Sequence, residues 1–183
     1  ALCSGEFLTF QDADDISKPE RLEMLLNAMQ ADSSLGMVGS WASLIDAKGV
    51  KIGVDKRPLG YEEILESYNK LNPFCGATVM IRRTVYKTIG GYREKLIGFS
   101  YQDYDWVSLV VDKFKSINLS LELYMYRQHG SSVSKTISLK RRIGFDLVKG
   151  LINQRITVGF DVLQENDENK FNKERIRWEK VFL

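Results

Sequence analysis

The chain has 183 residues, 44% of them hydrophobic and 27% charged, a mixture typical of one soluble globular domain with a hydrophobic core. Its formal net charge of +2 is too weak to indicate nucleic-acid binding. Two cysteines in unlike contexts, Cys3 and Cys75, do not form a disulfide framework, and they fit a reducing cytosol. No apolar run approaches the roughly 20 residues that a membrane span requires.

A short apolar run, Phe7 to Phe10, predicts a buried strand over residues 6–11, and Asp12, Asp14 and Asp15 follow it directly. Because desolvated carboxylates are costly, this strand should end at a polar crevice, where open α/β sheets bind ligands. In an extended chain Asp12 and Asp14 would point to one side and would suit Mg²⁺ or Mn²⁺. The alternative is a turn and a helix cap, the more common role of a bare Asp-x-Asp.

Hydrophobic periodicity predicts the remaining elements. A helix over 19–31 follows the acidic stretch, with Ser17 as its N-cap. The pattern then predicts strands over 37–45, 50–54, 77–81 and 117–126, a turn over 46–49, and helices over 61–68, 84–89, 103–114, 139–152 and 170–180.

A second acidic pair, Asp103 and Asp105, opens the helix predicted over 103–114. Acids in a first helical turn are favoured by the helix dipole, which is the structural interpretation. The functional interpretation is a general base that takes the proton of an acceptor hydroxyl. A helix start would hold such a base rigidly.

Two loops carry further candidates. His129, the only histidine, follows a strand together with Arg127, Ser131 and Ser132. A lone histidine is more often structural, but this loop also offers Arg127 and two hydroxyls to phosphate oxygens. In the loop over 72–76, Gly76 would let a ligand approach the backbone, and Cys75 is interpreted as a packing residue.

These segments, in this order, resemble the motifs of family 2 glycosyltransferases with the GT-A fold. The resemblance covers roughly residues 5–134 and implies an α/β fold, a partial GT-A domain with a mixed sheet flanked by helices. It implies that residues 1–134 bind metal, donor sugar and acceptor. The resemblance does not cover residues 135–183, which the hydrophobic periodicity predicts to be a helical extension. In that family about the first third of the catalytic domain, which holds the nucleotide base, precedes this point, so we expect the chain to be the C-terminal part. The matching segments are GEFLTFQDADD, Gly76 to Arg83, GGYRE from Gly90, the QD pair at Gln102 and YRQHGSSVS from Tyr126.

The resemblance implies transfer of a sugar, with inversion, from a nucleotide-diphosphate donor, expected to be a UDP-sugar, to a hydroxyl of a carbohydrate or lipid-linked glycan. It places this reaction in cell-surface polysaccharide or glycan synthesis and implies a Mn²⁺ or Mg²⁺ cofactor. Asp103 is the expected catalytic base, with Asp105 as runner-up, although Gln102 stands where the family has Glu. The other expected contacts are Asp12, Asp14 and His129 to the metal, Asp12, Arg127, Ser131, Ser132 and Gly76 to the donor, and Gln102, Asp105, Gly91 and Tyr92 to the acceptor.

Two alternatives stay open at this point. Without the preceding nucleotide-binding units, the chain would be a catalytically incomplete module that binds metal or glycan or is structural. The basic helix over 139–152 either packs on the domain, which we favour, or rests on an anionic membrane surface. The second case would place a cytoplasmic protein at the inner face of the membrane.

Overall fold

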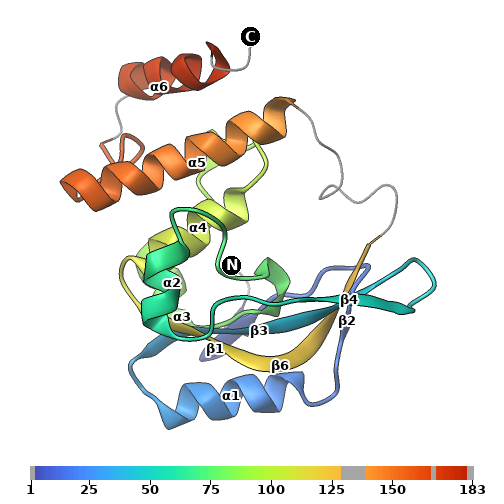
Figure 1. Ribbon diagram of the computed structural model, residues 1–183. Helices are drawn as coiled ribbons and strands as arrows, with labels where there is room; N and C mark the ends of the chain where they lie inside the picture. The colour runs from blue at the N-terminus through green and yellow to red at the C-terminus, as the bar shows by residue number, and fades with distance from the viewer. Residues whose placement is uncertain (1–2, 129–138, 166–167, 181–183) are drawn as a thin grey trace.

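The computed structural model describes residues 3–128, 139–165 and 168–180 (Figure 1). At its centre lies a curled mixed sheet of six strands in the order β1-β5-β3-β6-β2, with β4 paired to β3. β3 and β6 are parallel, whereas the pairings of β1, β2, β4 and β5 are antiparallel. The strands are β1 (Phe7–Thr9), β2 (Ile16–Ser17), β3 (Leu35–Ile45), β4 (Lys51–Asp55), β5 (Met80–Arg82) and β6 (Lys115–Arg127).

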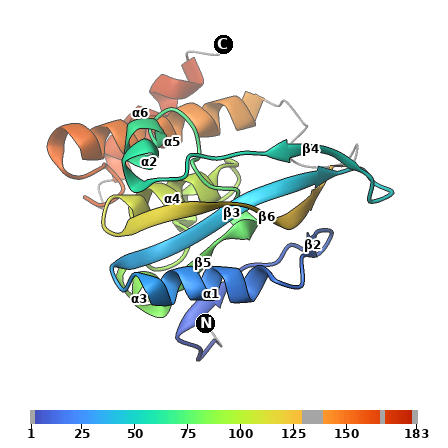
Figure 2. The ribbon, with the colours of Figure 1, turned by 60° about the horizontal axis from the view of Figure 1, so that its bottom comes forward.

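Helices lie on both faces of this sheet (Figure 2), so the predicted mixed α/β fold with flanking helices is confirmed. They are α1 (Arg21–Ala31), α2 (Tyr61–Ser67), η1 (Gly76–Thr78), α3 (Arg83–Ile89), η2 (Glu94–Leu96), α4 (Gln102–Val111), α5 (Leu139–Val158) and α6 (Glu168–Lys180). The predicted turn over 46–49 is also confirmed, because Asp46 and Val50 close it and Gly49 adopts φ 86°.

The long strand β3 is the centre of the core because its side chains are buried on both faces of the sheet. Close packing here requires Gly39. A Cβ atom at Gly39 would lie 2.3 Å from the Oδ1 atom of Asn118 and 2.6 Å from Cδ1 of Phe74. The neighbouring strand and the loop over 72–76 therefore approach β3 more closely than any side chain at position 39 would allow.

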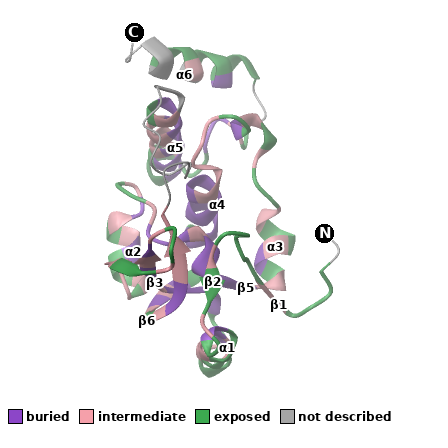
Figure 3. Ribbon diagram, turned by 90° about the vertical axis from the view of Figure 1, so that its right-hand side faces the viewer, coloured by how far each residue is buried: buried purple, intermediate pink, exposed green. Residues whose placement is uncertain are grey.

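Two apolar clusters cover the two faces of the sheet. Below it, Leu25 and Met29 of α1 pack on Leu35, Val38 and Met80. On the other face α2, α3 and α4 share a larger cluster, and α4 is buried between the sheet and α5 (Figure 3). The first residues of α4 are thereby fixed from both sides.

The helical tail belongs to the same core. Leu147, Leu151 and Ile152 of α5 are buried in one cluster with Trp106 and Val107 of α4. The expectation that this helix packs on the domain is confirmed, and its apolar face is not available to a membrane. Among the described residues, no helix combines the length and the apolar character needed to cross a bilayer.

Buried ion pairs connect α4 to the tail. Asp105 and Asp161, both 0% exposed, share the guanidinium of Arg93, whose Nη1 lies 2.8 Å from Oδ1 of Asp161. Arg155 of α5 contacts Asp161 at 2.6 Å and Asp112 at 2.5 Å. The two buried carboxylates, Asp105 and Asp161, thus each have a guanidinium partner, which buried ions require.

The first strand, predicted as buried over residues 6–11, spans only Phe7–Thr9 and is at most half-buried. Two further local predictions were wrong. Ser17 does not cap α1, because Ile16 and Ser17 pair with β6 as β2, and α1 begins at Arg21 after Glu20. The strand predicted over 77–81 is confined to Met80–Arg82, and the residues before it form the 3₁₀ turn η1. In both places a tertiary contact decided the local structure.

Substitution Asp161→Ala should lower the free energy of unfolding by about 3–5 kcal/mol, because it leaves the guanidinium groups of Arg93 and Arg155 without their shared buried carboxylate. Burial raises the pKa of Asp161, but Arg93 and Arg155 outweigh that effect and hold the pKa below its usual range. The stabilisation is therefore present above the ordinary pKa of about 3.9 and is lost as the pH falls through the lowered value. Urea unfolding at several pH values measures both effects.

The matched control is Glu165→Ala, which removes a carboxylate four positions later that pairs with Lys170 at the surface. Surface pairs contribute little, so its effect should stay within about 1 kcal/mol. Equal destabilisation by the two substitutions would contradict the role assigned to the buried pairs.

Candidate active site

A cavity of about 780 Å³ opens where β1, β3, β4 and β6 end, the place at which open α/β sheets bind ligands. Segments far apart in the sequence line it, including the acidic loop after β1, the loop over 71–77 and the start of α4. The residues of chemical interest in its wall are Asp12, Arg57, Asn72, Cys75, Gly76, Tyr92, Asp103, Gln128 and Arg141.

Asp103 is the expected catalytic base, and it lies in this wall in the first turn of α4. Burial raises its pKa above the ordinary 3.8, although the amides of Tyr104 and Asp103 itself, together with Arg57 and Arg141, oppose that shift. The Nδ2 atom of Asn72 donates a hydrogen bond to its Oδ2 at 3.2 Å. A partly exposed carboxylate with a raised pKa is the kind of group that serves as a general base.

The backbone enters α4 in an uncommon conformation. Tyr101, the N-cap, adopts φ 68°, a left-handed value that a bulky residue seldom takes. Its ring lies 5.2 Å from the ring of Phe145 on α5, and the guanidinium of Arg141 lies 5.2 Å from its centre. Contacts from the tail thus hold the turn that presents Asp103.

Asp105 was predicted as an acceptor contact and as the runner-up base, and this assignment is corrected by the structure. It is 0% exposed and forms an ion pair with Arg93, so no acceptor can reach it. The reason is the helix geometry, since residues two positions apart in a helix point to different sides.

Of the other three expected acceptor contacts, one lines the cavity and two do not. Tyr92 lines the cavity, is 52% exposed and packs its ring edge-on against Trp106 at 6.3 Å. Gln102 lies outside the lining, because its side-chain amide donates to the carbonyl of Leu96 at 3.1 Å. Gly91 is exposed and also lies outside the lining.

The acidic loop is a turn rather than an extended segment. The Asp15 amide faces the carbonyl of Asp12 at 3.4 Å, and the Asp12 amide donates to the Tyr124 hydroxyl at 3.0 Å. Asp12 therefore lines the cavity, whereas Asp14, also exposed, lies outside its lining. The expectation that both carboxylates point to one side of an extended chain is corrected accordingly.

Arg127 lies outside the cavity lining and holds this loop, so its expected contact with the donor stays a prediction. Its Nε donates to the carbonyl of Asp14 at 2.7 Å, and its Nη1 donates to the carbonyl of Asp46 at 3.1 Å. Its amide donates to Oδ1 of Asp15 at 2.7 Å. Arg127 thus joins the acidic loop to the turn between β3 and β4.

The acidic loop has the donor chemistry of a divalent-cation site. Asp12 and Asp14 are exposed, and Oδ2 of Asp15 is buried without a hydrogen-bond partner. The described residues contain no group of three or more acidic, histidine or cysteine ligands. Mg²⁺ is often held by one or two carboxylates together with substrate phosphates, so this set fits such an ion. The expected ligand His129 and the expected donor contacts Ser131 and Ser132 lie outside the described residues.

Arg21, which sequence reasoning missed, supports the loop from below. It is 1% exposed, and its guanidinium donates to the carbonyl of Phe10 and the hydroxyl of Thr9, each at 2.9 Å. It also donates to the carbonyl of Ala77 and lies 4.7 Å from the ring centre of Tyr124. A lone basic residue in a predicted helix carries no signal for this role.

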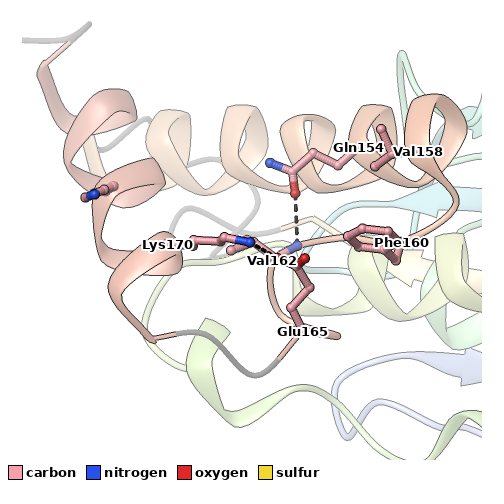
Figure 4. A pocket seen from close by; sticks show the side chains of 7 residues that line it. Gln154, Val158, Phe160, Val162, Glu165 and Lys170 are labelled. Carbon is pink, nitrogen blue, oxygen red and sulfur yellow. Dashed lines mark hydrogen bonds and ion pairs between the residues drawn. The ribbon is translucent and has the colours of Figure 1, made fainter.

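A second hollow, of about 390 Å³, lies between the end of α5 and α6 (Figure 4). Its polar groups are engaged with each other, since Lys170 pairs with Glu165 at 3.0 Å and Gln154 accepts the amide of Val162. It is lined by Gln154, Val158, Phe160, Val162, Glu165, Lys170 and Lys173. One acid paired with a lysine offers neither a base nor a cation site, so the first cavity is the candidate active site.

The mixed sheet and the acidic cavity at its edge define a partial GT-A glycosyltransferase fold. The family model described as "Glycosyltransferase like family 2" matches residues 1–146. The chain therefore belongs to glycosyltransferase family 2.

Relatives from several organisms agree with this family. The chain is 30% identical over 129 residues to the uncharacterised glycosyltransferase MJ1057 of Methanocaldococcus jannaschii, covering 69% of this chain and 43% of that protein. It is 29% identical over 133 residues to EpsE of Bacillus subtilis, covering 72% of this chain and 47% of EpsE. It is 24% identical over 102 residues to UDP-Gal:alpha-D-GlcNAc-diphosphoundecaprenol beta-1,3-galactosyltransferase of Escherichia coli, covering 56% and 36%. The chain thus spans about half the length, or less, of the curated relatives it matches.

Cys75 lines the cavity, but we expect its thiol to be unreactive. The side chain is buried, and burial raises the pKa of the thiol to about 12. Because the thiolate is the reactive form, native protein at pH 8 should incorporate one equivalent of iodoacetamide, at exposed Cys3, and unfolded protein should incorporate two. Mass spectrometry of labelled peptides measures this, and rapid native labelling of Cys75 would contradict the packing role.

Proposed function

We propose that this chain forms the metal-, sugar- and acceptor-binding part of an inverting glycosyltransferase that transfers a sugar from a UDP-sugar to a hydroxyl acceptor. The observation that carries the proposal is Asp103, a carboxylate with a raised pKa that shares one cavity with Asp12 of the acidic loop. Membership of family 2 supports the reaction class. UDP and the inverting stereochemistry rest on the family resemblance alone.

In the proposed reaction Asp103 takes the proton from the acceptor hydroxyl as that oxygen attacks the anomeric carbon of the sugar. A new carbon–oxygen bond forms on one face while the bond to the diphosphate oxygen breaks on the other. The nucleoside diphosphate leaves with the electron pair, and the configuration at the anomeric carbon is inverted. Tyr92 and Gly76 line the space in which the two sugars would meet.

The proposed cofactor is Mn²⁺ or Mg²⁺, held by the carboxylates of Asp12 and Asp14, with His129 as a further ligand. When bound, such an ion offsets the negative charge that develops on the leaving diphosphate. The protein prepares this region by fixing the loop backbone, through Tyr124 to the Asp12 amide and through Arg127 to the Asp14 carbonyl. Ser131 and Ser132 are proposed donor contacts, as expected from the sequence.

The proposed acceptor is a carbohydrate or a lipid-linked glycan in polysaccharide or glycan synthesis. One relative, from Escherichia coli, is named for transfer to a sugar on diphosphoundecaprenol, which supports the lipid-linked class. A contact with the inner face of the membrane would then bring enzyme and acceptor together. The transfer assays described below separate catalysis from the alternative of a metal- or glycan-binding module, which would transfer nothing.

Substitution Asp103→Asn should reduce transfer by about 10²–10⁴-fold, the usual contribution of a general base. The reduction is measured by assaying transfer from UDP-glucose, UDP-galactose and UDP-N-acetylglucosamine to a panel of alkyl glycosides, with the released UDP as the readout. Because the pKa of Asp103 is raised, activity of the unsubstituted protein should increase with pH through a value above the ordinary 3.8. The variant should lack this limb of the pH profile.

Asp105→Asn is the matched comparison on the same helix. It removes the buried carboxylate that pairs with the half-buried Arg93, so the midpoint of urea unfolding should fall. Asp103→Asn should leave that midpoint nearly unchanged. A fully active Asp103→Asn variant would mean that Asp103 is not the base.

Mn²⁺ and UDP together should raise the melting temperature of the chain, because they bind the native state alone. At ligand concentrations near 100 Kd the gain is about 2.7 kcal/mol, or roughly 5–10 °C for a domain of this size. The shift should require the metal and should disappear in the double variant Asp12→Ala with Asp14→Ala. Glu20→Ala, an exposed acid outside the cavity, should keep it; an equal shift in the double variant would contradict the metal assignment.

A further inference from the structure

Among the described residues, Asn72 donates a side-chain hydrogen bond to the Asp103 carboxylate. Its Nδ2 lies 3.2 Å from Oδ2 of Asp103. The other end of the same amide is occupied as well, because Oδ1 of Asn72 accepts the amide of Phe74 at 3.1 Å. An amide nitrogen cannot accept the Phe74 proton, so this contact fixes which end of Asn72 faces Asp103.

The loop that carries Asn72 is held at two further points. Nη1 of Arg57 donates to the carbonyl of Asn72 at 2.6 Å, and Nη2 of the same guanidinium pairs with Asp55 at 2.8 Å. One residue later, Nδ2 of Asn118 donates to the carbonyl of Pro73 at 3.0 Å. The amide of Asn72 is thus anchored to β4 and β6 before it reaches the start of α4.

We propose that Asn72 is a positioning residue that orients the catalytic carboxylate of Asp103 toward the acceptor hydroxyl. This inference rests on the proposed function, in which Asp103 is the base. A carboxylate has about four lone-pair positions on its two oxygens. Asn72 and the first amides of α4 occupy some of them, which leaves a defined direction for the incoming proton.

Other groups that face Asp103 set its electrostatic surroundings. Arg57, beyond β4, and Arg141, on α5, both favour the ionised carboxylate. Tyr92 and the Cys75 thiol also lie close enough to interact with it. A new negative charge at position 72 would therefore change the electrostatic environment of Asp103 while these other neighbours stay the same.

Substitution Asn72→Asp tests the proposal because it keeps the shape and the Oδ1 acceptor for Phe74 but replaces the donor by a second carboxylate. Two neighbouring carboxylates raise one another's affinity for protons, so the pKa of Asp103 should rise by about one unit or more. Carboxyl-carbon NMR titration of the whole chain measures this without any turnover. In transfer assays at pH values below the new pKa, kcat should fall about tenfold. The acid limb of the pH profile of kcat should shift by the same amount as the pKa of Asp103, and KM for the UDP-sugar should stay unchanged.

Asn72→Ala is the second variant, in case the added charge impairs folding. It should lower kcat about tenfold without changing KM for the donor, because the base is present but less well oriented. The matched control is Asn153→Asp, which adds the same charge at an exposed position of α5 outside the cavity. It should leave the pKa of Asp103 and the pH profile as they are.

The outcomes separate this inference from the proposed function. If Asp103→Asn is inactive while both Asn72 variants keep the kcat, pH profile and Asp103 pKa of the unsubstituted protein, the positioning role is overturned and the base is retained. If Asp103→Asn remains active, the proposed function fails and the positioning role fails with it. An upward shift of the Asp103 pKa and of the acid limb in Asn72→Asp alone supports the inference.

Discussion

The guanidinium of Arg21 sits under the acidic loop with almost no access to water, and much of the site geometry follows from that. Burial of a cation disfavours its charged form, which lowers the pKa of Arg21. Its donors must therefore meet acceptors in fixed places, and these are supplied by Thr9, Phe10 and Ala77. One side chain connects the end of β1 and the turn η1 to α1. The position of the acidic loop relative to the wall of the cavity is therefore fixed.

On the other side of the sheet, arginine side chains meet carboxylates instead of neutral acceptors. Arg93 and Arg155 hold two buried carboxylates, Asp105 and Asp161, between α4 and the tail. These contacts, with the apolar packing of α5, fix the first turn of α4 in space. A base at a helix start is useful only when the helix itself cannot move. The tail therefore contributes to the cavity indirectly through this packing and directly through Arg141.

Much of the architecture could be predicted because it depends on local patterns. Local sequence patterns indicate burial or backbone conformation directly. Examples are the apolar alternation in β4, the helical spacing of apolar residues in α1 and the glycines after α3. Asp12, Gly76, Tyr92 and Asp103 were selected from motifs, and all four line the cavity. Ser17 was misassigned, because pairing with β6 is a contact between residues more than one hundred positions apart. The backbone contacts of Arg127 could not be predicted for a related reason, since its acceptors are carbonyls of Asp14 and Asp46.

By itself, the sequence determined the family, the order of the helices and strands, and the short set of acids from which the proposed base was chosen. The tertiary structure separated Asp103 from Asp105, which open the same helix and carry the same chemical group. Successive helical residues are about 100° apart, so side chains two positions apart differ by about 200° in direction. One of them faces the cavity and Asn72, and the other faces Arg93 in the core. Only the positions of those partners, which lie in distant parts of the chain, distinguish an acid in the cavity wall from a buried ion pair.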